Sequence, residues 1–296
     1  MDVPGGPRVA ALYRYPVKGL SAEPLDEVEL RADEGVPGDR VFALALPDTE
    51  FDEERPTALR KQRFLMLQRD EALARVRTGY DPGTGLLSVD DGSRRWSADL
   101  GTAAGRRAVE EYFGALAAAT AGTDGANPPA GLAGPEGRSG RPGRRSERPA
   151  GRSGLPRLVT ARGGHRFTDA GPSGPALMQA VSVVNLSSVR DLAERVGQPV
   201  HPLRFRANVY LDGIPAWAER EWVGKEIVLG PVRARVLAGT VRCAATTVNP
   251  DTAERDIKVL KELSANYGHT ECGCYIQIGT PGVLRLGDAV APPAAA

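Results

Sequence analysis

One cysteine in the last fifth of the chain has neighbours that suit a thiol-based site. Arg242 precedes Cys243, and Thr246 follows three residues later. A thiolate is both a nucleophile and a soft metal ligand, and a nearby cation favours the charged form of sulfur. A cysteine can equally be a small buried apolar side chain. The rest of the sequence must decide between a reactive and a buried thiol.

Further cations and hydrogen-bonding residues suit an anionic ligand. Arg204, Arg206 and Asn208 alternate along a segment that we interpret as a strand, so they would share one face. Guanidinium groups bind phosphates and carboxylates through paired hydrogen bonds. The alternative is a solvated strand face. Lys18 and Arg40, each beside a predicted turn, are weaker candidates for the same anion.

Two cysteines near the C-terminal end suggest zinc. His269, Cys272 and Cys274 lie within six residues, and Cys243 would add a fourth ligand. The Cys-x-Cys spacing departs from the usual Cys-x2-Cys, and a second pair is missing. A zinc-stabilised binding module is therefore one hypothesis. The sequence contains no phosphate loop and no Gly-x-Ser-x-Gly elbow, and three histidines give a Ser-His-Asp hydrolase little support.

The composition predicts a soluble protein of the cytoplasm. The 296 residues carry 38 Lys and Arg against 37 Asp and Glu, and this net charge of +1 argues against a general nucleic-acid or acidic-membrane partner. Three cysteines are an odd number, which disfavours a disulfide framework. The N-terminus lacks the pattern of a signal peptide, and no apolar run approaches the roughly 20 residues of a membrane span.

Hydrophobic patterns predict a β-rich α+β fold. Apolar runs with period two predict strands, whereas two helix-spaced faces stop at Gly197 and Gly268. Asn185 is a suitable N-cap for the first of these helices. The predicted strands are residues 9–15, 25–30, 41–46, 86–89, 209–211, 226–229, 232–236, 275–278 and 283–286, and the predicted helices are 105–119, 186–196 and 257–267.

Residues 120–157 differ in composition from the rest of the chain. They are mainly Gly, Pro, Arg, Ser and Ala, and so few large apolar residues cannot offset the entropy of ordering. The arginines suggest nucleic-acid binding, but without aromatic residues for stacking a solvated basic loop is favoured. We therefore predict an N-terminal domain over 1–119, a disordered insertion over 120–157 and a second domain over 158–291.

Together these motifs resemble the MOSC family, and the N-terminal part is similar to that family's companion domain. The architecture most resembles the mitochondrial amidoxime-reducing component and its bacterial relatives. The resemblance covers nearly the whole chain outside 120–157. It implies an N-terminal β-barrel-like domain and a MOSC-type β-barrel domain with flanking helices. The matching motifs are Tyr15-Pro-Val-Lys-Gly19, Gly38-Asp-Arg40, Ser188 to Leu192, Arg206 with Asn208, and Arg242-Cys243 with Thr246 to Thr252.

The resemblance implies a role for each matched residue. Cys243 would ligate molybdenum or carry sulfur as a persulfide, and Lys18, Arg40 and Arg206 would counter the cofactor's negative charge. The other implied cofactor-binding residues are Ser188, Asn208, Arg242 and Thr246. Gly19 and Ala207 replace the family's serine and proline, and residues 258–263 and 272–275 depart from its pattern where they could line the substrate side.

Two functional hypotheses follow from the resemblance. The first is an oxidoreductase with a molybdopterin-type molybdenum cofactor, which reduces a small N-oxygenated substrate by oxygen-atom transfer. No C-terminal cysteine quartet for an iron–sulfur cluster follows, so a separate electron-donor protein is expected. The alternative is a persulfide sulfur carrier or sulfurtransferase that uses Cys243 without bound metal. Pyridoxal phosphate binding is implied by family association alone.

Overall fold

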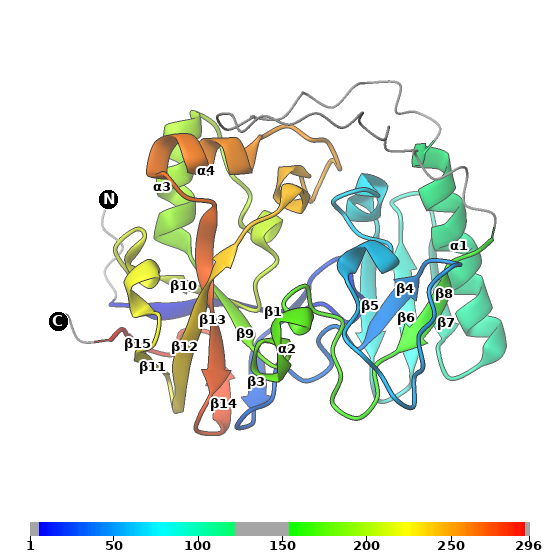
Figure 1. Cartoon of the computed structure of the whole chain (residues 1–296), viewed down its shortest axis with the longest axis horizontal. Coiled ribbons are helices and arrows are strands. Elements are labelled where there is room, and N and C mark those ends of the chain that lie inside the picture. Colours follow the sequence, from blue (N-terminus) through cyan, green and yellow to red (C-terminus); the bar gives the residue numbers. More distant parts are fainter. Residues whose placement is uncertain (1–5, 122–153, 294–296) are drawn as a thin grey trace, which may run out of the picture.

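The computed structural model describes residues 6–121 and 154–293, and their fold is β-rich with few helices (Figure 1). This confirms the α+β class predicted from the hydrophobic patterns. None of the described helices is long and apolar enough to cross a membrane. The strands are β1 (Arg8–Arg14), β2 (Glu23–Leu25), β3 (Glu27–Leu30), β4 (Phe42–Ala45), β5 (Arg77–Asp81), β6 (Leu86–Asp90), β7 (Arg95–Asp99), β8 (Arg157–Thr160), β9 (Val181–Asn185), β10 (Val209–Asp212), β11 (Glu226–Leu229), β12 (Val232–Val241), β13 (Glu271–Ile278), β14 (Gly282–Arg285) and β15 (Val290–Ala291). The α-helices are α1 (Ala103–Ala121), α2 (Pro175–Met178), α3 (Leu186–Val196) and α4 (Val259–Tyr267).

The main sheet has eight strands in the order β15-β11-β12-β13-β9-β10-β1-β2. Its strands alternate between two apolar layers: Val183 belongs to the larger core on one face, and Val184 to the layer shared with α3 and α4. This follows from the period of two, which sends successive side chains to opposite faces. Helices α3 and α4 lie side by side over that second layer (Figure 1).

Helix α3 provides the crossover that the one parallel pair of this sheet requires. Strands β9 and β10 run parallel, and such strands cannot be joined by a tight hairpin. The helix begins where the Asn185 side chain accepts a hydrogen bond from the Ser187 amide at 3.0 Å. It ends at Gly197, which is left-handed with a φ of 75°. Both predicted caps are therefore confirmed.

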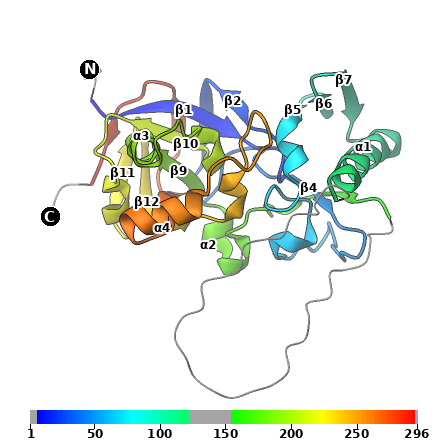
Figure 2. The same cartoon turned by 90° about the horizontal axis from the view of Figure 1, so that it is seen from above.

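A second group of elements lies beside the main sheet. Strands β5, β6 and β7 form an antiparallel sheet, β4 pairs with β8, and α1 packs along them (Figure 2). The apolar face predicted for residues 105–119 is the buried one, because Val109 and Phe113 are fully covered. This group supplies several loops that face the end of the main sheet.

Strand pairing joins the N-terminal and C-terminal parts of the chain. Strands β1 and β2 extend the main sheet next to β10, β3 pairs with β14, and β4 pairs with β8. The boundaries predicted for domains 1–119 and 158–291 therefore do not coincide with sheet boundaries, and the division itself stays a prediction. Most of the predicted insertion 120–157 lies outside the described residues.

Candidate functional site

A cavity of about 520 Å³ lies where the ends of β9, β12 and β13 meet loops of the second group. Its lining includes six cationic side chains and one acidic one: Lys18, Arg40, Lys61, Arg204, Arg206, Arg242 and Asp169. Cys243, Asn208 and Thr246 also line it, so seven of the eight sequence-predicted site residues meet here. An excess of cations in a concave site suits an anionic ligand.

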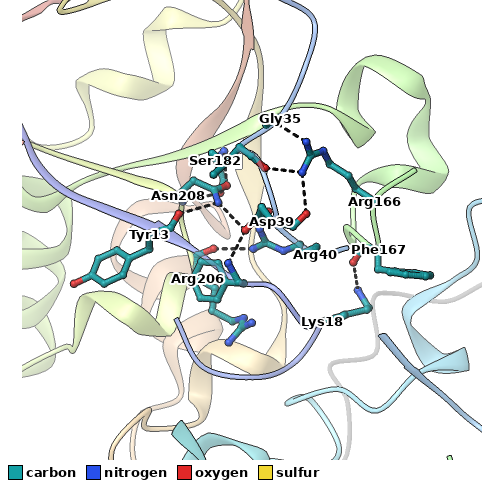
Figure 3. A network of polar contacts seen from close by, with 12 residues as sticks. Tyr13, Lys18, Gly35, Asp39, Arg40, Arg166, Phe167, Ser182, Arg206 and Asn208 are labelled. Atoms are coloured by element: carbon teal, nitrogen blue, oxygen red, sulfur yellow. Dashed lines mark hydrogen bonds and ion pairs between the residues drawn. The ribbon is translucent and has the colours of Figure 1, made fainter. Parts of the chain in front are cut away.

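Two arginines share one tyrosine ring at what we call the arginine end of the cavity. The guanidinium carbons of Arg40 and Arg206 lie 4.8 and 4.4 Å from the centroid of the buried Tyr15 ring. Both arginines have left-handed backbones, with φ of 51° and 50°. Such backbone strain in non-glycine residues is concentrated at functional sites. The Arg206 guanidinium makes no hydrogen bond to any described residue, so its donors face the cavity (Figure 3).

A buried carboxylate holds the arginine end in place. Asp39 accepts hydrogen bonds from the Tyr15 amide at 2.7 Å and from Asn208 Nδ2 at 3.0 Å, and it forms an ion pair with Arg40. Arg166 in turn donates to the carbonyls of Val36 and Asp39 at 2.6 and 2.9 Å (Figure 3). No motif marked Arg166, because most of its partners are backbone carbonyls far away in the sequence.

Asn208 is a positioning residue in this structure. Its Oδ1 accepts hydrogen bonds from the amide and hydroxyl of Ser182, and its Nδ2 donates to Tyr13 and Asp39. Only 3% of the residue is exposed. These four hydrogen bonds occupy both acceptor sites of its Oδ1 and both N–H donors of its Nδ2. Its predicted contact with a cofactor stays a prediction.

Lys18 also lines the cavity and is almost covered, with 7% of the residue exposed. It donates to the Phe167 carbonyl at 3.1 Å and pairs with Asp169. Burial lowers the pKa of Lys18, against the opposing effect of Asp169. The next residue, Gly19, is left-handed with a φ of 84°, a conformation that the serine expected at this position would adopt only with strain.

The thiol lies on a short turn at the end of β12. Cys243 precedes a 3-10 turn (Ala244–Thr247), and its carbonyl accepts hydrogen bonds from the amide and hydroxyl of Thr246 at 3.0 and 2.9 Å. The hydroxyl of Thr246, a residue predicted to bind the cofactor, therefore donates its hydrogen bond within the turn. Cys243 itself is partly exposed and lines the cavity.

The predicted strand through Arg204, Arg206 and Asn208 is wrong. Pro202–Phe205 form a 3-10 helix, begun by His201, whose Nδ1 accepts from the Leu203 amide at 3.1 Å. Arg206 then turns left-handed, so strict alternation of side chains is lost. Arg204 instead holds the cysteine turn by donating to the Thr247 carbonyl at 3.0 Å and pairing with both oxygens of Asp256 at 2.6 Å.

Arg242 also acts on backbone carbonyls. Its Nε donates to the Cys272 carbonyl and its Nη1 to the Phe205 carbonyl, both at 2.7 Å. The guanidinium carbon lies 5.3 Å from the Phe205 ring centroid. Arg242 therefore fastens the end of β12 to β13 and to the 3-10 helix before Arg206.

Lys61 was missed by the sequence analysis. It opens a 3-10 turn (Lys61–Arg63), lines the cavity together with Cys243, interacts electrostatically with the Cys243 sulfur and has its Nζ 3.7 Å from Asp169. Burial alone would lower the pKa of Lys61, but the Cys243 sulfur and Asp169 raise it overall. Its segment contains no motif, and only the fold brings it to a cysteine 182 positions later. We call Lys61 and Cys243 the thiol end of the cavity.

A family model for the MOSC domain matches residues 162–291. Residues 162–291 of the chain thus match a MOSC domain. The mitochondrial amidoxime-reducing component 1 of Mus musculus is 32% identical over 120 residues, which cover 36% of this chain and 35% of the relative. The molybdenum cofactor sulfurase of Homo sapiens is 31% identical over 96 residues, 30% of this chain and 11% of the relative. The match thus spans about a third of the amidoxime-reducing component. Among solved structures, the YUAD protein from Bacillus subtilis has a TM-score of 0.39 at 12% identity, covering 96% of this chain and 93% of that chain.

Ser188 is the predicted site residue that the MOSC domain does not bring to the cavity. It is fully buried at the start of α3, donates to Glu219 at 2.8 Å and accepts from the Trp217 amide at 2.8 Å. Burial raises the pKa of Glu219, and Ser188 supplies one of its compensating hydrogen bonds. Ser188 is therefore bound into the layer under the helices, away from the cavity lining.

The other two cysteines of the MOSC domain do not form the predicted zinc site. Both are fully buried, and burial raises the pKa of Cys272 and of Cys274 to about 12. Gly273 is left-handed with a φ of 83°, so Cys272 joins the layer under α3 and α4 while Cys274 joins the core on the other face. Within residues 6–121 and 154–293, no group of three or more His, Cys, Asp or Glu could hold a metal ion. The thiols face opposite layers, which contradicts the zinc hypothesis.

Several buried polar atoms around the cavity have no hydrogen-bond partner in the described structure. They are Gln68 Oε1, Thr168 Oγ1, Arg204 Nε and Thr240 Oγ1. Buried polar groups left without partners are costly, and each one calls for a missing partner. Their gathering along one cavity suits a ligand that presents both donors and acceptors.

Proposed function

We propose that the cavity binds the molybdenum cofactor and that the chain uses it to reduce a small N-oxygenated substrate. The name of the molybdenum cofactor sulfurase supports a function related to that cofactor, and the name of the amidoxime-reducing component supports reduction of an N-oxygenated substrate. The observation that carries the proposal is one cavity that joins a partly exposed thiol, two guanidiniums on one ring and four unpartnered polar atoms. A cofactor with a soft-metal end, an anionic end and a hydrogen-bonding pterin between them fits this set of groups.

Each part of the cofactor would find matching chemistry. Arg206, with its free donors, and Arg40 would bind the phosphate, because guanidiniums pair with phosphate oxygens. Lys18 would add a third positive charge. Thr240 and Thr168 would bond the pterin edge through the hydroxyls that lack partners. The Cys243 thiolate would ligate molybdenum, as soft ligands favour sulfur-rich metal centres.

The chain itself would bind, orient and shield the reactants. When bound, the cofactor would supply two-electron oxygen-atom transfer. Reduction of an N–OH group to N–H consumes two electrons and two protons and releases the oxygen as water. A separate electron-donor protein would supply the electrons. The buried network around Asp39 keeps the anion-binding groups fixed, so little reorganisation would accompany binding.

Metal content tests this proposal. Protein made in a host that synthesises the cofactor should contain molybdenum near one equivalent per chain, and Cys243→Ser should lose most of it. The control is Cys272→Ala, a buried thiol outside the cavity lining, which should retain the metal wherever the variant is folded. Folded wild-type protein without molybdenum would contradict the proposal.

The second candidate function is sulfur transfer through Cys243 without metal. It is favoured by the contrast between this partly exposed thiol, which lines the cavity together with Lys61, and the two buried thiols. A donor persulfide would pass its outer sulfur to the Cys243 thiolate, which forms a new S–S bond while the donor leaves as a thiol. Incubation with a cysteine desulfurase and cysteine should then add 32 Da, the mass of one sulfur, to the Cys243 peptide alone. Absence of that mass excludes this function.

A further inference from the structure

Most cations of the cavity are already committed to partners of the chain. Arg242 is bonded to backbone carbonyls, and Arg204 to Asp256 and the cysteine turn. Arg40 and Arg206 lie together on Tyr15 at the arginine end, where the proposed phosphate would bind. Lys18 is nearly covered and pairs with Asp169. Lys61 is thus the cation that remains beside the thiol.

Lys61 has hydrogen-bonding capacity to spare. An ammonium group has three donors. Within the described residues, Lys61 interacts electrostatically with the Cys243 sulfur and pairs with Asp169, whose nearest carboxylate oxygen is 3.7 Å away. That distance exceeds a normal hydrogen bond, and the carboxylate of Asp169 is half-exposed and bonded more closely to Lys18. A carboxylate from outside could therefore approach Lys61 without breaking a tight ion pair.

The wall of the cavity also offers apolar surface. Val241, at the end of β12 and two residues before the thiol, is 68% exposed and lines the cavity. Met66 and Leu177 line it as well and are partly exposed. Exposed apolar side chains in a concave site favour the apolar part of a ligand.

We infer that Lys61 is a specificity residue that binds a carboxylate of the substrate. This inference rests on the proposed function. It narrows the substrate class to small N-oxygenated compounds that carry a carboxylate on an apolar body. The carboxylate would contact Lys61, the apolar body would lie against Val241 and its neighbours, and the N–O group would face the thiol end. Neutral N-oxygenated compounds would lack the ionic contact and bind more weakly.

The charge beside the thiol can be measured without cofactor. Full-length protein from a host that lacks the cofactor pathway is alkylated with iodoacetate, which is anionic, and with iodoacetamide, which is neutral. The ratio of the two rates cancels the fraction of thiolate and reports attraction of a carboxylate. Because Cys272 and Cys274 are buried, the native protein should be labelled at Cys243, which peptide mass confirms.

Replacement of Lys61 should change this ratio selectively. Lys61→Met should lower it about fivefold, which corresponds to loss of one ionic contact near 4 Å in a solvated site. Lys61→Arg should keep it within about twofold, since the charge remains. Lys261→Met, on the exposed face of α4 and outside the cavity lining, is the matched control and should leave it unchanged. An unchanged ratio in folded Lys61→Met overturns the inference.

The cofactor-loaded protein tests the substrate class itself. Steady-state rates are compared for an aromatic N-hydroxyamidine and its ring-carboxylated derivative, with a reduced dye as electron donor. Wild type should favour the carboxylate in kcat/KM about tenfold, the value of one charge-assisted hydrogen bond, and Lys61→Met should lose this preference through KM. Equal use of both compounds by wild type overturns the inference while leaving the proposed function intact. Inactivity towards both counts against the proposed function, and the alkylation ratio then decides on Lys61 alone.

Discussion

The two ends of the cavity differ in how firmly the fold holds them. At the arginine end, Tyr15, Asp39 and Asn208 are buried and joined by hydrogen bonds, and both arginines have strained backbones. At the thiol end, Cys243 is partly exposed on a short turn, and Lys61 has a loose ion pair at 3.7 Å.

This difference separates two tasks. A fixed arginine end suits permanent binding of an anion, because preorganised donors need no rearrangement. A thiol end with spare donors and exposed apolar surface suits molecules that enter and leave. Substitutions at the arginine end should therefore mainly lower the free energy of unfolding, whereas substitutions at the thiol end should also change the reactivity of Cys243.

Removal of Asp39 should have the largest effect on stability. Asp39→Ala removes the carboxylate that pairs with Arg40, the acceptor of the Tyr15 amide and one of the two acceptors of Asn208 Nδ2. We expect the free energy of unfolding to fall by about 3–5 kcal/mol, measured by urea denaturation. Asp48→Ala, which breaks the exposed pair with Arg63, is the control and should cost less than about 0.5 kcal/mol. Equal costs for both variants would mean that the arginine end is not specially anchored.

Arg204→Met should have an intermediate effect on the free energy of unfolding. It should also make the turn that carries Cys243 more mobile. It removes the bonds to the Thr247 carbonyl and to Asp256, although Asp256 is partly exposed and can turn to water. The expected loss is about 2 kcal/mol, together with faster iodoacetamide labelling of Cys243. Arg285→Met, which breaks an exposed pair with Glu27, should change neither quantity. Labelling at the wild-type rate would show that Arg204 does not control the cysteine turn.

Tyr15→Phe should have the smallest effect. Burial raises the pKa of Tyr15 to about 12, so its hydroxyl is neutral and donates to the Ala207 carbonyl at 3.2 Å. Loss of this bond should cost about 1 kcal/mol, while the ring between the arginines remains.

Binding of inorganic phosphate, followed by calorimetry, separates the ring of Tyr15 from its hydroxyl. Tyr15→Phe should bind as the wild type does, whereas Tyr15→Leu should bind about fivefold more weakly because the cation–π contacts are lost. If Phe weakens phosphate binding as much as Leu does, the ring does not position the arginines.

Local patterns predicted the elements better than the contacts between them. The caps of α3 at Asn185 and Gly197 follow from residue types that act within one turn. The strand expected through Arg204 and Arg206 was wrong because a 3-10 helix and a left-handed residue interrupt the alternation. Ser188 matched a motif, but its hydroxyl donates a hydrogen bond to Glu219, a buried residue that lies 31 positions later in the sequence. For Ser188, the deciding partner lay outside the window in which a local pattern can be recognised.

The amino-acid order alone located helices α1, α3 and α4 and several of the strands, and it singled out Cys243 as the cysteine with polar neighbours, because periodicity and side-chain type are local properties. Tertiary structure decided that Arg40, Arg206 and Cys243 line one cavity and that Lys61 lies beside the thiol. It also decided that Cys272 and Cys274 face opposite layers. These outcomes depend on strand pairing between distant segments, such as β1 with β10 and β12 with β13, and on burial that competes with exposure over the whole molecule.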